Sequence, residues 1–535
     1  MRICLISREY PPETGWGGIA TFTRHLAHGL KEIGHDVEVV SLSRGEDHLQ
    51  DDEGIPVHRV KQEWLGERLG TISMCMPYSR YVLMTSTALW RKFFQLHVKK
   101  PFDVVDTPEL LAEGLFPAIS RALPLLIRLY TPHSKFIKEK LHNVTPSFDH
   151  EFVAGVERVA MLSADVLPSP SQDLARFVAD DLNYDLEKIA IVRNPIDPGQ
   201  FSPDGKVALE KSDKVRVLFV GRLEERKGIH YLVDAIPKVT ARHKNVEFVI
   251  IGDDTNNATG QRSVLAELKA KIERDGTGRF IKFISRIPLD ELPAHYRSAD
   301  ISIVPSVYDN SPYTCQEAMS CGNPVIGTNS GGTAEYLEHG VSGLAIPPRD
   351  SDAIAEALNT LIGDEKKRTE MGSAARKRVV EEFDRKEIAR QTAELYELGQ
   401  QRFLARSESS MYRKEPEEML QDAHFMLAAF DKMIYDTLYQ YSWRFRFRHW
   451  GRIIKKRPRL FLAKLGARVM GAVDRATGHR VNSFHNLSQW LAEESVRRSQ
   501  DLPIDHLLRV DRSEMEPTAG QQRADMDDKF ASLGK

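Results

Sequence analysis

The chain has 535 residues, of which 41% are hydrophobic and 28% are charged, and its formal net charge is −2. This length exceeds that of one typical domain, and the composition is that of an ordinary globular protein. The near-neutral charge excludes a general attraction to nucleic acid, and no apolar run approaches the roughly 20 residues that a membrane span needs. The four cysteines show neither a disulfide framework nor zinc spacing, and the chain enters a strand without a signal peptide, so we expect a cytoplasmic protein.

The first 41 residues have the pattern of a strand, a helix and a second strand. Residues 2–7 and 37–41 are strand-like, and an amphipathic helix begins between them after a long loop. Gly17 and Gly18 open that helix, where bare backbone N–H groups could approach a phosphate. The glycine pair alone is a weak signal, because it lacks the dinucleotide-binding Gly-x-Gly-x-x-Gly pattern.

Residues 60–100 predict amphipathic helices with exposed aromatic side chains, which either recognise an acceptor or are simply solvated. Strands follow at 102–106 and 125–130. The second strand places His133 just beyond its carboxyl end, where ligands bind in open parallel sheets. A histidine there serves either a functional site or the local structure alone.

A domain boundary is expected near residue 200. Residues 165–171 and 191–197 close the first half, and the polar stretch 202–214 reads as a linker. The second half opens with a strand at 215–220. Arg222 and Lys227 follow it at the strand's carboxyl end, where two cations could grip a diphosphate, the alternative being a basic surface loop.

The stretch 301–335 predicts a strand, a polar loop, a short helix from Thr314 to Met319 and a second strand. Asp309 lies before that helix and Glu317 on its second turn. The unpaired N–H groups between the two carboxylates could hold an anion such as a phosphate. The alternative is an ordinary helix cap, with Asp and Ser before the helix.

These motifs together closely resemble the retaining GT-B glycosyltransferases of family 4 (glycosyl transferases group 1). The resemblance rests on the Gly-Gly loop, Asn194-Pro-Ile-Asp, Gly221-Arg-Leu with Lys227-Gly, and Glu317-Ala-Met. The family carries a Glu, seven residues and a second Glu, but here the first position is Asp309. The shorter side chain bears on sugar choice more than on activity, because Asp still accepts two hydroxyl hydrogen bonds.

The resemblance implies two doubly wound Rossmann-like α/β domains facing each other across a cleft, plus a mainly helical C-terminal extension. The expected divisions are an acceptor-side domain (1–200), a donor-binding domain (201–382), a crossing-back helix (383–400), a basic and aromatic helical extension (401–511) and a disordered tail (512–535). The resemblance implies a nucleotide-sugar donor, with UDP favoured over GDP and ADP, and an acceptor that is a sugar or a lipid-linked sugar.

The resemblance also assigns roles to individual residues. Catalysis would involve Asp309 and His133 near the transferred sugar and Arg222 and Lys227 on the diphosphate, with no metal and no cofactor. The donor-binding set would be Gly17, Gly18, Arg222, Lys227, Arg286, Ile287, Asp309, Ser311, Pro312, Tyr313, Thr314 and Glu317, with Arg286 and Ile287 beside the base and Glu317 on the ribose. Two alternatives are another GT-B nucleotide-sugar enzyme, such as an epimerase or a phosphorylase, and a degenerate donor-binding scaffold without catalysis.

Nothing after residue 405 belongs to that pattern. Met419, Met426 and Met433 repeat with helical spacing. Residues 443–468 combine aromatics with ten Lys or Arg and no acid, which suits an anionic membrane surface. Packing on the catalytic body, or non-specific contact with single-stranded nucleic acid, would also fit, and no specific nucleic acid is expected.

Overall fold

The structure is a computed structural model that describes residues 1–15, 17–62, 76–140, 148–255, 263–409, 458–476, 486–487 and 489–491. The chain forms two compact units, the first of residues 1–62, 85–145 and 153–416, and the second of residues 63–84, 146–152 and 417–535. The expected methionine-rich helix around Met426 and the expected disordered tail after residue 511 lie outside the described residues.

The first sheet has the strand order β3-β4-β2-β1-β5-β6 and is parallel except for the β3–β4 pair. A parallel pair, β7-β8, extends this half. Its strands are β1 (Arg2–Ile6), β2 (Asp36–Leu42), β3 (His48–Asp51), β4 (Pro56–Val60), β5 (Val104–Pro108), β6 (Leu125–Arg128), β7 (Leu167–Ser169) and β8 (Ile189–Ile191). Its helices are α1 (Gly18–Glu32), α3 (Pro77–Lys99), α4 (Leu115–Ser120), α5 (His133–Lys140), α6 (Phe148–Ser163) and α7 (Gln172–Leu182), with short 3₁₀ turns at Leu110–Ala112 and Leu186–Lys188.

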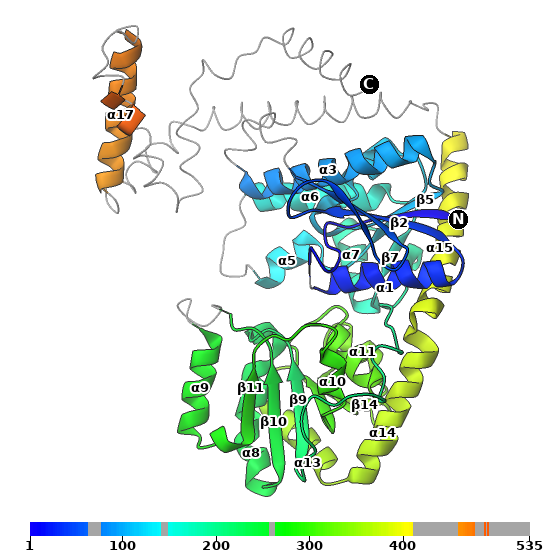
Figure 1. Ribbon diagram of the computed structural model, residues 1–535, viewed down its shortest axis with the longest axis vertical. Coiled ribbons are helices and arrows are strands. Elements are labelled where there is room, and N and C mark those ends of the chain that lie inside the picture. Colours follow the sequence, from blue (N-terminus) through cyan, green and yellow to red (C-terminus); the bar gives the residue numbers. More distant parts are fainter. Residues whose placement is uncertain are drawn as a thin grey trace. The chain divides into compact units, whose positions relative to one another are not determined.

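The second sheet is wholly parallel, in the order β11-β10-β9-β12-β13-β14 (Figure 1). Its strands are β9 (Val215–Val220), β10 (Val246–Ile251), β11 (Ile281–Ile284), β12 (Ile301–Val304), β13 (Val325–Thr328) and β14 (Gly343–Ile346). Its helices are α8 (Ile229–Arg242), α9 (Val264–Arg274), α10 (Leu292–Tyr296), α11 (Tyr313–Ser320), α12 (Thr333–Tyr336), α13 (Ser351–Ile362) and α14 (Glu365–Arg378), with 3₁₀ turns at Glu225–Lys227 and Gly278–Phe280. In both sheets the buried strands are rich in β-branched residues, as strands covered on both faces require. The expected pair of doubly wound α/β domains is confirmed.

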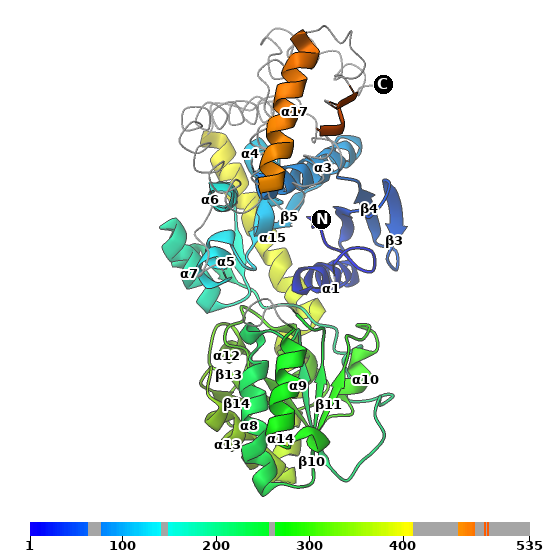
Figure 2. The same cartoon turned by 90° about the vertical axis from the view of Figure 1, so that its left-hand side faces the viewer.

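The chain returns to the first sheet through a short π-helix (Val379–Phe383) and the long helix α15 (Arg385–Ser409), which runs beside α1 (Figures 1 and 2). The amide N–H of Ile196 donates to the carbonyl of Phe383, so the two connections between the sheets run side by side. Gly29 of α1 allows the close approach, because a Cβ there would lie 2.3 Å from the carbonyl oxygen of Arg385. The helix continues beyond residue 400, where the sequence suggested that it ends.

The aromatics of α3 differ from the expectation that they are exposed. Trp90 and Phe93 are buried, and their rings stack with centroids 5.0 Å apart. Phe93 also stacks on Phe102 at the start of the next strand region. Residues three apart on a helix share a face, so this pair points into the core and cannot serve as an exposed acceptor platform.

The second unit contains α17 (Pro458–Ala476), which begins at a proline. Proline is tolerated in the first helical turn because its missing N–H has no partner there anyway. Leu462, Leu465 and Val469 lie on one face of α17 with 63%, 44% and 53% of their surface exposed. Among the described residues, no helix is both long and apolar enough to cross a membrane.

Candidate active site

The loop between β12 and α11 carries Asp309 and is held in place by two glycines. A Cβ at Gly332 would lie 1.8 Å from the carbonyl oxygen of Asn310, and one at Gly331 would lie 2.3 Å from that of Asp309. The Gly332 N–H donates to the Asp309 carbonyl at 2.9 Å. The glycine turn after β13 therefore fixes where the Asp309 backbone lies.

Two cations converge on the Asp309 carboxylate. Lys227 Nζ lies 2.5 Å from Oδ2, and Arg226 Nη1 lies 3.5 Å from the same oxygen. Burial by itself would raise the pKa of Asp309, but the charges of Lys227 and Arg226 hold it below its ordinary value. Asp309 is therefore an ionised acceptor beside a cation pair.

The cations reach Asp309 because the loop after β9 lies directly against the loop after β12. Gly228 has φ +73°, and a Cβ there would lie 1.8 Å from the carbonyl oxygen of Pro305. The Val307 N–H donates to the Arg226 carbonyl at 2.8 Å. A larger residue than glycine at 228 would separate Lys227 from Asp309.

Arg222 leaves the same loop and remains accessible, with 55% of its side chain exposed. Glu224 accepts from Arg222 at 3.2 Å and from Arg226 at 2.9 Å. One acid therefore orients two arginines. The segment 222–227 carries three cations and two acids, and the exposed guanidinium of Arg222 could make a forked contact with a diphosphate.

Glu317 is buried on the second turn of α11. Burial raises its pKa to about 7, against the lowering effect of the Tyr296 hydroxyl, which donates to Glu317 Oε2 at 2.9 Å. Lys227 also lowers this pKa through its charge, so one cation acts electrostatically on both carboxylates. The second oxygen of Glu317 can accept hydroxyl hydrogen bonds.

The helix-cap interpretation of this segment is wrong. The N-cap of α11 is Pro312, and no side chain caps the helix. The Ser311 hydroxyl instead bonds the Tyr336 hydroxyl, and the Thr314 carbonyl accepts from Tyr296 at 3.4 Å. The first N–H groups of α11 therefore donate to no capping side chain.

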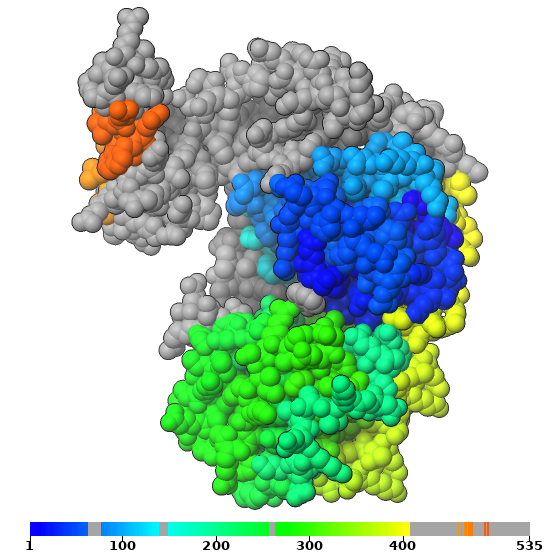
Figure 3. Space-filling view, in the orientation of Figure 1, coloured from blue at the N-terminus to red at the C-terminus, as the bar shows by residue number. Residues whose placement is uncertain are grey.

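Residues of the first α/β half of the chain lie beside the Asp309 loop and α11. In Figure 3 the blue first half and the green second half adjoin each other. A Cβ at Gly18 would lie 3.7 Å from the ring of Tyr313, which places the start of α1 beside the start of α11. Gly17 is the N-cap residue of α1 and is exposed. His133 is buried at the start of α5, where its ring stacks on Phe136.

Comparison with known proteins agrees with this geometry. Residues 203–378 match the model described as glycosyl transferases group 1, and residues 16–200 match that of glycosyltransferase family 4. A D-inositol 3-phosphate glycosyltransferase of Corynebacterium glutamicum is 30% identical over 53% of this chain and 69% of its own length. This chain belongs to glycosyltransferase family 4. An uncharacterised glycosyltransferase of Methanocaldococcus jannaschii is 26% identical over 75% of this chain and 98% of its own length.

The GT-B fold of this glycosyltransferase is also found in solved structures. An Anabaena protein, HepE, crystallised in complex with UDP-glucose, has a TM-score of 0.54 and 20% identity, and the match covers 74% of this chain and 99% of that one. The two doubly wound domains of the family 4 glycosyltransferase are thus seen in a protein of low sequence similarity.

Two of the expected donor-binding positions lie apart from the others. Arg286 and Ile287 follow β11, and Arg286 Nη1 lies 3.8 Å from Asp253 Oδ2. In the sheet, β10 and β9 separate β11 from β12, which carries the Asp309 loop.

Sequence reasoning missed three neighbours of the site in this family 4 glycosyltransferase. Arg226 adjoins Lys227, and its charge could have suggested a role. Tyr296 belongs to the site because its hydroxyl contacts Glu317. Asn310 belongs to it because its side chain bonds to Thr131, in the turn after β6. The last two depend on tertiary contacts that no local pattern contains.

Proposed function

We propose that this glycosyltransferase moves a sugar from a nucleoside diphosphate sugar to an acceptor hydroxyl, with retention of configuration to give an α-glycoside and without a metal ion. The observation that carries the proposal is the placement of Lys227, 2.5 Å from Asp309, with Arg222 on the same loop. These cations would stabilise the negative charge that the diphosphate gains as it leaves.

Each side chain would then have a distinct task. Lys227 has three N–H donors, so it can bond a diphosphate oxygen while it keeps Asp309 in place. Asp309 would accept hydroxyls of the transferred sugar, and Glu317 would accept the ribose hydroxyls. Residues 311–314 at the start of α11 would face the diphosphate together with the Gly17–Gly18 backbone, with Tyr313 and Thr314 as the N–H donors.

The remaining sites complete the proposed assignment. His133 would contact the transferred sugar, and Arg286 and Ile287 would lie beside the base. The acceptor side would be residues 1–200 and the donor domain residues 201–382, with the helix from 383 crossing back. An acceptor hydroxyl would attack on the face from which the diphosphate departs, and the departing phosphate would take up its proton.

The choice of donor is open to direct measurement. UDP-sugars are favoured over GDP- and ADP-sugars, in keeping with the UDP-glucose complex of the Anabaena protein. Thermal shift with each nucleotide identifies the base, since a ligand at a hundred times its Kd adds about 2.7 kcal/mol to stability. Product anomer determination by NMR then tests retention, and a β-linked product would overturn the proposed mechanism.

The C-terminal extension would hold the enzyme at the cytoplasmic face of a membrane, close to a lipid-linked acceptor. The basic segment 443–468 and the exposed Leu462, Leu465 and Val469 on α17 support this placement. Full-length protein should float with anionic liposomes at low salt and not with neutral ones. A chain ending near residue 405 should stay in the soluble fraction yet keep donor hydrolysis; flotation of both forms would contradict this role.

A further inference from the structure

The backbone N–H groups of the turn that joins β6 to α5 donate to side chains rather than to backbone carbonyls. The N–H groups of Tyr130 and Thr131 donate to Glu109 Oε1 at 2.7 and 2.6 Å. The N–H of His133 donates to Glu157 Oε2 at 2.5 Å. Pro132 has no N–H group, so it needs no acceptor. The conformation of this turn therefore depends on two buried carboxyl groups that are distant in sequence.

Glu157 also holds a second, unfavourable turn. Its Oε1 accepts from the Leu111 N–H at 2.7 Å. Leu111 and Ala112, just after β5, have φ values of +56° and +49°, a left-handed conformation that side chains disfavour. Such a conformation persists only where the surroundings impose it, and it is typical of functional sites. One carboxyl group thus ties the end of β5 to the start of α5.

The same turn is gripped from the other side by the donor-binding loop. The Asn310 side-chain amide donates to the Tyr130 carbonyl, and to the Thr131 hydroxyl at 2.7 Å. The Tyr308 hydroxyl in turn donates to Asn310 Oδ1 at 2.6 Å. Asn310 adjoins Asp309, so the turn at residues 130–133 lies between the buried acids and the proposed sugar-binding carboxylate.

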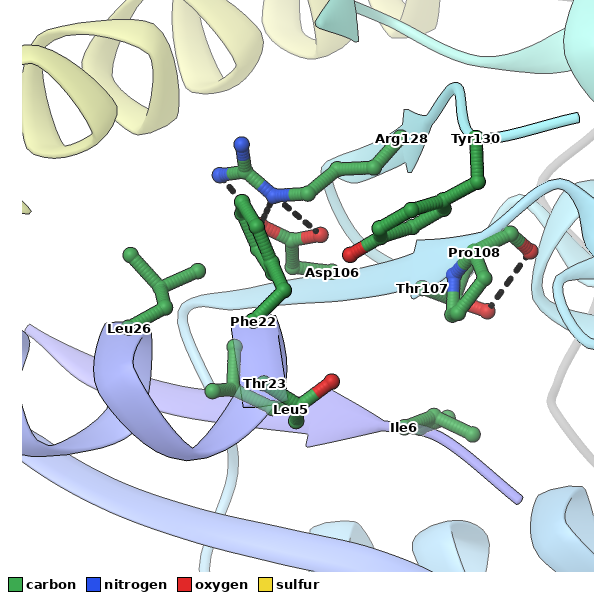
Figure 4. Close-up of a pocket in the computed structure, with 10 residues that line it drawn as sticks. All are labelled: Leu5, Ile6, Phe22, Thr23, Leu26, Asp106, Thr107, Pro108, Arg128 and Tyr130. Atoms are coloured by element: carbon green, nitrogen blue, oxygen red, sulfur yellow. Dashed lines mark hydrogen bonds and ion pairs between the residues drawn. The ribbon is translucent and has the colours of Figure 1, made fainter. Parts of the chain in front are cut away.

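A small cavity lies beside this turn, and its lining includes side chains that hold the end of β6 in place (Figure 4). The Arg128 guanidinium lies against Asp106, with Nη2 2.8 Å from Oδ2, and Tyr130 lines the same cavity. The Tyr396 hydroxyl of α15 donates to Asp106 at 2.8 Å. The end of β6 is therefore anchored to the crossing-back helix, and the turn is the next segment whose position must be set.

We propose that Glu157 and Glu109 are positioning residues that hold the turn at residues 130–133, so that His133 and the Asn310-bearing loop meet in the active geometry. This inference rests on the proposed role of His133 at the transferred sugar. Glu157 acts on the His133 backbone, and Glu109 presents the carbonyl and hydroxyl that Asn310 grips. Both acids are buried, so neither would contact the donor.

The two acids differ in how they use their oxygens, and this difference supplies the test. Glu109 Oε1 accepts both N–H bonds, while Glu109 Oε2 is buried without a hydrogen-bond partner in the described part of the chain. A glutamine amide oxygen can replace Oε1 and accept both bonds. Glu157 uses both oxygens, so glutamine there would turn an NH₂ group toward a backbone N–H and lose a bond.

The experiment measures donor hydrolysis, as nucleoside diphosphate released from UDP-glucose, GDP-mannose or ADP-glucose, together with UDP, GDP and ADP binding by thermal shift. Glu109→Ala should lower kcat at least about tenfold, because small displacements of catalytic geometry cost that much, and Glu109→Gln should recover it. The kcat of Glu157→Gln should stay low, with nucleotide binding unchanged in each variant.

Asp165→Asn is the matched control, because Asp165 accepts the Leu125 N–H at the opposite end of β6. This change should alter thermal stability without altering kcat.

A double-mutant cycle separates this inference from the proposed function. If Glu157 acts through His133, the effects of Glu157→Gln and His133→Ala on kcat will not add in the double variant. Additive effects, or a folded Glu157→Gln variant with normal kcat while His133→Ala is impaired, would overturn the inference alone. Normal kcat in His133→Ala would instead remove the proposed role of His133. If Glu157→Gln does not fold, Asn310→Ala tests the turn from the donor side, and normal kcat there would also count against the inference.

Discussion

The loop around Asp309 and the turn around His133 form the two halves of the proposed site, and they are held in opposite ways. The Asp309 loop is fixed by ionised groups, because two cations converge on one carboxylate. The His133 turn is fixed by backbone N–H groups that donate to buried acids. Burial raises the pKa of Glu109 to about 8 and that of Glu157 well above its ordinary value.

This difference indicates a division of labour. In the proposed mechanism the charge that acts on the donor comes from the second domain, where Lys227, Arg226 and Arg222 lie on one loop. In the first domain the turn is held by Glu109 and Glu157, whose raised pKa values favour the neutral form. Changes to the second domain should therefore act through charge, and changes to the first domain through geometry.

The largest effect should follow from removing the cations. Lys227→Ala and Arg222→Ala should each lower turnover by at least about a hundredfold with the fold intact, because fixed charges on a leaving group act mainly in the transition state. Lys238→Ala is the matched control, since Lys238 pairs with Asp352 on the surface of the same domain. Steady-state hydrolysis and transfer assays measure the change. Turnover close to that of the unaltered enzyme in either purified variant would contradict the proposal that these cations stabilise the leaving diphosphate.

Replacing the carboxylate between the cations should have the next largest effect. Asp309→Asn should lower transfer by about tenfold to a hundredfold, the usual result of losing a charged hydrogen bond, and should change the preference among donor sugars. The measurement is kcat/KM for a panel of nucleotide-sugars. Unchanged transfer with only a lower Tm would show that Asp309 serves the loop and not the sugar.

Glu317 should act on nucleotide affinity more than on turnover. Glu317→Gln should weaken binding by about tenfold, because an ionised acceptor is stronger than an amide. The pKa of Glu317 is raised to about 7, so the unaltered enzyme should bind its nucleotide more tightly as pH rises through 7. Titration calorimetry at pH 6 and pH 8 measures both effects. The same pH dependence in Glu317→Gln would assign it to another group.

The sequence predicted the second half of the site better than the first, for a physical reason. Arg222, Lys227, Asp309 and Glu317 lie in short segments at strand ends, so strand order alone brings them to one edge of a parallel sheet. The two sheets were predicted for the same reason, since their buried strands are continuous apolar runs.

The first half escaped prediction because its partners are far apart in the chain. Glu109 and Glu157 read as ordinary helix or loop acids, and nothing in their neighbours indicates burial. The exposure of the α3 aromatics was misjudged likewise, since whether Trp90 faces solvent depends on what packs over it. Arg226 was visible beside Lys227, but its contact with Asp309 depends on two loops meeting at Gly228.

Glu109→Gln should have the smallest effect on activity, and its effect should show instead as a pH-dependent change of stability. The pKa of Glu109 is about 8 in the folded chain and close to its ordinary value when unfolded, so the folded state holds the proton longer. Below pH 4.5 both states are protonated and Glu109 contributes no difference. Between these pKa values stability falls as pH rises, by up to about 1.4 kcal/mol per pH unit.

Glu109→Gln carries no such proton, so its Tm relative to that of the unaltered protein should climb from pH 5 to pH 8. The exposed Glu356 of α13 is the control, and Glu356→Gln should give a flat difference. A flat difference for Glu109→Gln as well would mean that the turn at residues 130–133 is held by an ionised carboxylate, and that the two halves of the site do not differ in charge.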